Sequence, residues 1–93
     1  MSLITKEFSK FNFKIAEVKS LHAAFNDYEK QVTTLIEEKL VYPAYDFVLK
    51  CSHIFNLLDS RGVISVTERA AFIARIRKMA KVCALLYMEK YQK

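Results

Sequence analysis

Residues 55–69, FNLLDSRGVISVTER, contain the end of one helix, a tight turn and the start of the next helix. Gly62 is the only glycine in the chain and follows directly on Asp59-Ser60-Arg61. A glycine can take the left-handed conformation that closes a helix, because it has no Cβ to clash with the backbone. We therefore expect a helix to end at Ser60 or Arg61.

The start of the next helix is indicated by Ser65-Val66-Thr67-Glu68, which has the S-x-x-E form of a capping box. In this motif the serine hydroxyl accepts a hydrogen bond from the glutamate N–H, and the glutamate carboxylate accepts one from the serine N–H. The pattern predicts a helix that starts at Val66. Only Val63 and Ile64 separate the two signals, so they should tuck under the corner of an antiparallel helix pair.

The whole chain has the composition of an all-helical domain. It is 53% hydrophobic but contains one glycine and one proline, whereas sheets and long loops need more turn residues. Its 93 residues suit one domain with a limited core. No apolar run approaches the ~18 residues of a membrane span, and the first residues lack the apolar segment of a signal peptide. We expect a cytoplasmic protein that does not meet a membrane.

The apolar spacing predicts three helices, at about 20–39, 43–60 and 66–91, packed as a three-helix bundle over residues 20–93. Apolar residues recur every three or four positions in each, and Pro43 suits a first helical turn. Residues 1–19 are predicted to form an extended arm, because Phe11, Phe13 and Ile15 alternate with polar residues. Side chains expected in the core are Leu21, Phe25, Tyr28, Val32, Leu35, Ile36, Tyr45, Val48, Leu49, Ser52, Ile54, Phe55, Leu58, Phe72, Ile73, Ile76, Met79, Ala80, Cys83, Leu86 and Tyr87.

Several stretches resemble one known family. These stretches are residues 55–69 and the segments YPAY at 42–45, KCSH at 50–53 and IARIR at 73–77. Together they look like the C-terminal helical region of the α subunit of the bacterial tetrameric (α2β2) glycyl-tRNA synthetase. The resemblance runs from about Phe8 to about Tyr87.

The resemblance implies a role for the chain. The parent enzyme is a class II aminoacyl-tRNA synthetase that ligates glycine to tRNA(Gly) with ATP and Mg²⁺, together with a larger β subunit. The helical region would serve architecture and subunit contact, and residues 1–19 would be the linker from the catalytic domain. No stretch here matches the family's ATP and glycine motifs, and a single glycine cannot form a phosphate-binding loop. We expect these 93 residues to be inactive on their own, without a cofactor site.

The second half of the chain is basic. Residues 47–93 carry nine Lys and Arg against three acids, whereas residues 1–46 carry six Lys against seven acids. The last predicted helix concentrates these cations and carries apolar residues outside its core stripe. Three interpretations stay open: a solvated face, contact with the β subunit or the parent catalytic domain, or phosphate contact with tRNA. The candidate contact residues are Arg69, Arg75, Arg77, Lys78, Lys81, Val82 and Leu85.

An alternative function is a free-standing basic helical module that binds tRNA or another nucleic acid through the same face. A further expectation concerns self-association. The phenylalanines of the arm, Phe8, Phe11 and Phe13, or the apolar residues outside the core stripe, could be exposed and pair two copies as a homodimer.

The remaining reactive side chains favour structural roles. Cys51 and Cys83 have no metal-ligand spacing and are expected as reduced core thiols. His22 and His53 are isolated, and positions 51 and 53 point to different sides of a helix. We therefore predict no catalytic, cofactor-binding or metal-binding residue. The corner should be fixed by caps and ion pairs of Asp59, Arg61, Gly62, Ser65 and Glu68, with Arg69.

Overall fold

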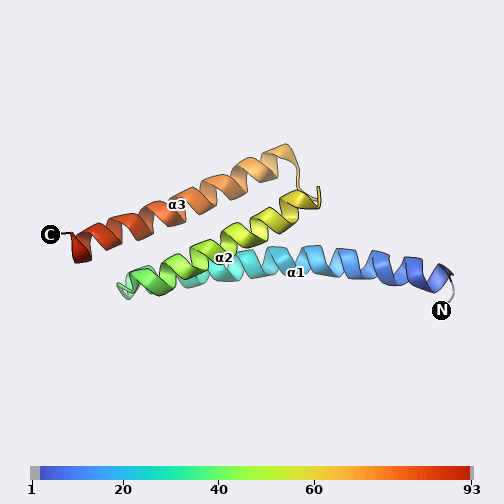
Figure 1. Cartoon of the computed structure of the whole chain (residues 1–93), viewed down its shortest axis with the longest axis horizontal. Coiled ribbons are helices and arrows are strands. Elements are labelled where there is room, and N and C mark those ends of the chain that lie inside the picture. Colours follow the sequence, from blue (N-terminus) through green and yellow to red (C-terminus); the bar gives the residue numbers. More distant parts are fainter. Residues whose placement is uncertain (1–2, 93) are drawn as a thin grey trace.

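The computed structural model describes the backbone of residues 3–92 and the side chains of residues 15–92. Within that part the chain forms three helices and no strand: α1 (Leu3–Glu37), α2 (Val41–Ser60) and α3 (Val66–Tyr91). The helices alternate in direction along the chain, so consecutive helices are antiparallel (Figure 1). The predicted all-α, three-helix fold is confirmed. None of these helices is long and apolar enough to cross a lipid bilayer.

The N-terminal segment differs from its prediction. The extended conformation predicted for residues 1–19 is wrong from residue 3 onward, because α1 begins at Leu3. No glycine or proline interrupts this stretch, and five apolar residues recur four and three positions apart, which is the spacing of one helix face. The alternation of Phe11, Phe13 and Ile15 hid that longer repeat. The five residues are Ile4, Phe8, Phe11, Ile15 and Val18.

This segment still projects as an arm, although a helical one. The N-terminal part of α1 extends past the corner between α2 and α3 (Figure 1). The molecule measures 65 × 25 × 15 Å, and its radius of gyration is 17.0 Å. A compact domain of this length would have a radius of gyration of about 12 Å. The pairing predicted through Phe8, Phe11 and Phe13 concerns side chains outside residues 15–92 and stays a prediction.

The core lies where the three helices meet. In α2 the buried residues recur every three or four positions, as expected for the helix between two others. Tyr45, Leu49 and Tyr87 were predicted in this core, but they are 49%, 51% and 38% exposed, so that part of the prediction is wrong. The buried residues of the core are Phe25, Val32, Val41, Ala44, Val48, Cys51, Ile54, Phe55, Leu58, Phe72, Met79, Cys83 and Leu86.

The α1–α2 corner lies two residues earlier in the chain than predicted. Helix α1 ends at Glu37 rather than 39, because Lys39 adopts a left-handed φ of 62°. The Lys39 N–H donates to the Ile36 carbonyl at 3.0 Å, and the Leu40 N–H donates to the Leu35 carbonyl at 2.9 Å. Helix α2 therefore begins at Val41 instead of 43. Pro43 still lies in its first turn, where a missing N–H leaves no intrahelical bond unmade.

Candidate functional site

The α2–α3 corner is built as a Schellman motif. Gly62 has a φ of 65°, and its N–H donates to the Asp59 carbonyl at 3.0 Å. The Val63 N–H reaches back to the Leu58 carbonyl at 3.4 Å. These two bonds satisfy the last carbonyls of α2, and Val63 packs against the core that contains Leu58. The predicted helix end at Ser60 is confirmed.

The start of α3 carries the predicted capping box. The Glu68 N–H donates to Ser65 Oγ at 3.1 Å, and the Ser65 N–H donates to Glu68 Oε1 at 3.0 Å. The hydrogen bond from the Ser65 N–H lowers the pKa of the Glu68 carboxyl. The capping box and the helix start at Val66 are therefore confirmed.

Two ion pairs surround this corner. Arg69 Nε lies 3.3 Å from Asp59 Oδ1, so the pair joins the start of α3 to the end of α2. The Arg61 guanidinium pairs with Glu17 of α1. This second pair joins the corner to α1, and the N-terminal part of α1 extends beyond the corner (Figure 1).

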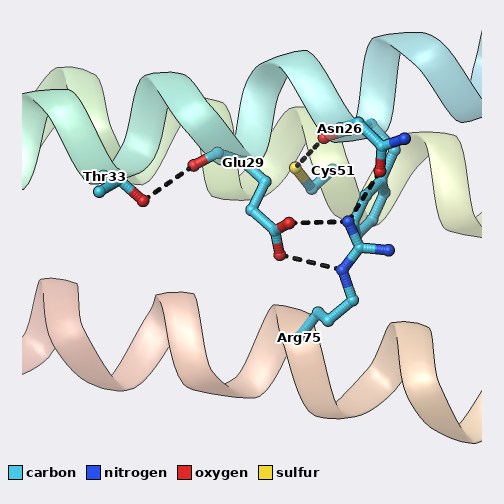
Figure 2. Close-up of polar contacts among 6 residues, drawn as sticks. Asn26, Glu29, Thr33, Cys51 and Arg75 are labelled. Carbon is cyan, nitrogen blue, oxygen red and sulfur yellow. Dashed lines mark hydrogen bonds and ion pairs between the residues drawn. The ribbon is translucent and has the colours of Figure 1, made fainter.

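A separate polar contact joins α3 to α1 at Arg75 (Figure 2). Arg75 Nε donates to Glu29 Oε2 at 3.0 Å, and its Nη2 donates to Glu29 Oε1 at 2.7 Å and to Asn26 Oδ1 at 2.8 Å. The guanidinium carbon also lies 4.5 Å from the centre of the Phe25 ring and 5.5 Å from that of Phe72. The contact combines a bidentate ion pair with stacking on two core rings.

The contact changes the pKa of both the Arg75 guanidinium and the Glu29 carboxyl. The hydrogen bond to Glu29 raises the pKa of Arg75. The same bond lowers the pKa of the Glu29 carboxyl, against the opposing effect of its partial burial. Both shifts favour the ion pair. Arg75 was a candidate for contact with a partner, and in this structure its guanidinium is occupied within the chain.

The other candidate residues all lie on α3 and differ in exposure. Arg77, Lys78, Lys81 and Leu85 are exposed, and Val82 is half-buried. Lys78 and Val82 line a groove of about 610 Å³ between α1 and α3. Arg77, Lys81 and Leu85 are not among the residues that line this groove. Their contact with a partner stays a prediction.

A second groove, of about 390 Å³, lies between α2 and α3 and is almost entirely apolar. Tyr42 and Tyr45 of α2 line one side, and Tyr87 and Met88 of α3 line the other. The Tyr42 ring lies 6.4 Å from the Tyr87 ring, centre to centre. All four residues are more than a third exposed. The groove therefore leaves a continuous aromatic surface open to solvent.

Sequence reasoning missed this surface, although a signal was present. Tyr42, Tyr45 and Leu49 are spaced three and four residues apart, which places them on one face of α2. Two of them were assigned to the core, because their spacing alone cannot tell an inward apolar face from an outward one. The adjacent positions Val41, Ala44 and Val48 have the same spacing and are buried.

The two thiols are buried, and the two imidazoles lie in different surroundings. Burial raises the pKa of Cys51 to about 11, and the pKa of Cys83 is raised by the same cause. The Cys51 thiol donates a weak hydrogen bond to the Phe25 carbonyl at 3.8 Å. His22 lies against the Phe72 ring, with 5.6 Å between ring centres, and His53 is exposed.

The sequence was also compared with models of protein families. Residues 2–92 match the family described as glycyl-tRNA synthetase alpha subunit. The match covers almost the whole chain, and the region includes the two corners, the Arg75 contact and the aromatic groove. This protein therefore belongs to the glycyl-tRNA synthetase α-subunit family.

Proposed function

We propose that these 93 residues form an architectural and subunit-contact domain of glycyl-tRNA synthetase. The parent enzyme ligates glycine to tRNA(Gly) with ATP, and the domain acts in the cytoplasm. Family membership supports the link to that enzyme and to its β subunit. The observation that carries the contact role is the exposed aromatic groove, because a surface of this kind on a small helical domain is typical of a protein interface.

We propose no magnesium–ATP site among these residues. In residues 15–92 no three His, Cys, Asp or Glu side chains come together as a metal site. Gly62 belongs to a helix corner rather than to a phosphate-binding loop. We therefore assign no catalytic step to these residues, and ATP and Mg²⁺ belong to the parent enzyme's active site.

Binding to the cognate β subunit tests the contact role. Isothermal titration of this chain into the β subunit should give a saturable complex, with one chain per β subunit. A glycine-dependent ATP–pyrophosphate exchange assay of the chain alone should give no signal. The proposal fails if the β subunit shows no binding at concentrations of about 100 μM, which corresponds to a weak interaction.

The alternative, a basic module that binds tRNA, has weaker support. Two of its five cations are held in intramolecular ion pairs, Arg69 with Asp59 and Arg75 with Glu29. Phosphate binding would show a steep salt dependence, because bound cations release counterions from the nucleic acid. Titration of tRNA at low and at moderate salt separates the two functions, and we expect no salt-dependent binding.

A further inference from the structure

We infer that the groove between α2 and α3 binds one amphipathic helix of a protein partner, and that this helix carries acidic residues along one edge. The inference rests on the proposed subunit-contact function and adds the location of the contact and the chemistry of the partner. It is carried by the shape of the groove and by the charge of its borders.

The groove has the dimensions of a helix-binding site. Its α3 side runs from Ala80 to Gln92, a rise of about 18 Å, or roughly three helical turns. Ala80 and Ala84, one turn apart, provide a shallow strip where a partner helix can approach closely. Tyr42, Tyr45 and Met88 stand at its sides. Apolar residues at i, i+3 or i+4, and i+7 of a partner helix would match such a groove.

The two borders of the groove differ in charge. On α2 the border is apolar and consists of Val41, Tyr42 and Tyr45. On α3, Arg77 and Lys81 lie seven and three residues before Ala84, so they continue the exposed row that borders the groove. No carboxylate is among the residues that line it. A partner helix would therefore meet apolar side chains on one edge and two cations on the other.

These two cations are available for a partner. The two carboxylates next to groove residues in the sequence, Asp46 after Tyr45 and Glu89 after Met88, pair with Lys50 at 3.0 Å and with Lys39 at 3.5 Å. Within residues 15–92, neither Arg77 nor Lys81 lies within ion-pair distance of a carboxylate. Aspartate or glutamate on the partner would complement them and set its orientation.

A second copy of the chain fits this surface less well. A two-fold interface uses the same patch on both partners. Pairing through the groove would therefore bring four cations, the Arg77 and Lys81 of each copy, into one interface with no carboxylate lining it. The other groove, between α1 and α3, mixes Glu29 and Glu37 with its cations and gives no comparable charge preference.

Charge reversal at the border tests the inference. The double variant R77E/K81E should bind the cognate β subunit at least about tenfold more weakly in isothermal titration, because both ion pairs become repulsive. The matched control is K19E/K30E, which makes the same change of charge at exposed positions of α1, a helix that does not line this groove, and its Kd should change less than about twofold. Tyr42→Ser should weaken binding by a similar or larger factor, since it removes an anchor at the groove.

Hydrogen exchange of the β subunit identifies the partner segment. The chain should protect a helical segment with apolar residues on one face and Asp or Glu beside them. Chemical denaturation of each variant checks that the bundle still folds.

The possible outcomes are distinct. If the unmodified chain does not bind the β subunit, the proposed function fails and the inference fails with it. If the chain binds but R77E/K81E and Tyr42→Ser bind equally well, the proposed function stands and the groove assignment is overturned. Protection of a segment without acidic residues also overturns it. So does a dimer of the chain, detected by light scattering, that Tyr42→Ser dissociates.

Discussion

The two corners of this bundle have the same backbone geometry but different side chains. Both end a helix with a Schellman motif, in which Lys39 at one corner and Gly62 at the other take a φ near 60°. The second corner adds the capping box of Ser65 and Glu68, whereas Leu40, the N-cap residue of α2, makes no side-chain capping bond. One geometry can thus be specified by local chemistry or be imposed by the packing of the helices around it.

The largest difference between the corners should come from the residues that anchor them. Leu58 and Leu35 occupy the same position, three residues before the cap, but Leu58 is fully buried and Leu35 only partly. Leu58→Ala should lower the free energy of unfolding by about 3 kcal/mol, because a cavity remains. Leu35→Ala should cost roughly half as much or less. Urea denaturation followed by circular dichroism measures both. Equal losses would show that the two corners are anchored equally.

Gly62→Ala tests the left-handed position itself. No atom lies within 4 Å of the place where the new Cβ would stand, so the cost is backbone strain alone. We expect a loss of about 1–2 kcal/mol in the free energy of unfolding. The same denaturation assay checks it. A change within experimental error would mean that the corner can shift to a right-handed conformation without loss.

Lys39→Gly tests the opposite change at the first corner. Glycine relieves the strain at a φ of 62° but gains freedom in the unfolded chain, so a net stabilisation of about 0.5 kcal/mol is expected. Lys39→Ala is the control, since it keeps the strain and removes the exposed ion pair with Glu89, and it should change little. If glycine and alanine had the same effect, the strain at Lys39 would be negligible.

The smallest effect should be the response of the second corner to acid. The pKa of Glu68 in the folded chain lies below its unfolded value of 4.5. Its contribution to stability is therefore present above pH 4.5 and is lost as the pH falls through the folded pKa. The first corner has no capping carboxylate to titrate.

Glu68→Gln isolates this effect, because glutamine can keep the capping bond but does not titrate. Unfolding of both chains is measured at pH 7 and pH 3. Glu29 titrates with the same sign in both chains and cancels in the difference. The chain with Glu68 should lose more stability than the variant. A variant that loses as much would indicate that the capping carboxylate contributes nothing on its own.

The contrast between the corners also explains which parts of the fold could be predicted. Gly62, Ser65 and Glu68 act within a few residues of each other, so their chemistry is readable in the sequence, and the boundaries at Ser60 and Val66 are confirmed. Lys39 carries no such signal. Its conformation follows from packing, and the predicted end of α1 was therefore two residues late.

The candidate site was harder to predict for a related reason. Exposure of Tyr45 and engagement of Arg75 depend on where neighbouring helices lie, and one helix's periodicity does not contain that information. Arg75 and Glu29 are 46 residues apart, so no local pattern pairs them. The basic character of α3 was visible in the sequence, but the aromatic groove beside Arg77 and Lys81 was recognised only once α2 and α3 were placed together.

The reaction rates of the two buried cysteines can be used to measure how often the helices of the bundle separate. A thiol reacts with alkylating reagents as the thiolate, and burial both shields Cys51 and raises its pKa to about 11. Reaction at neutral pH must therefore wait for the surrounding helices to separate. Cys51 of α2 donates a hydrogen bond to the Phe25 carbonyl of α1, whereas Cys83 lies on α3. Their relative labelling rates would reveal whether α3 leaves the bundle alone or only when the whole core opens.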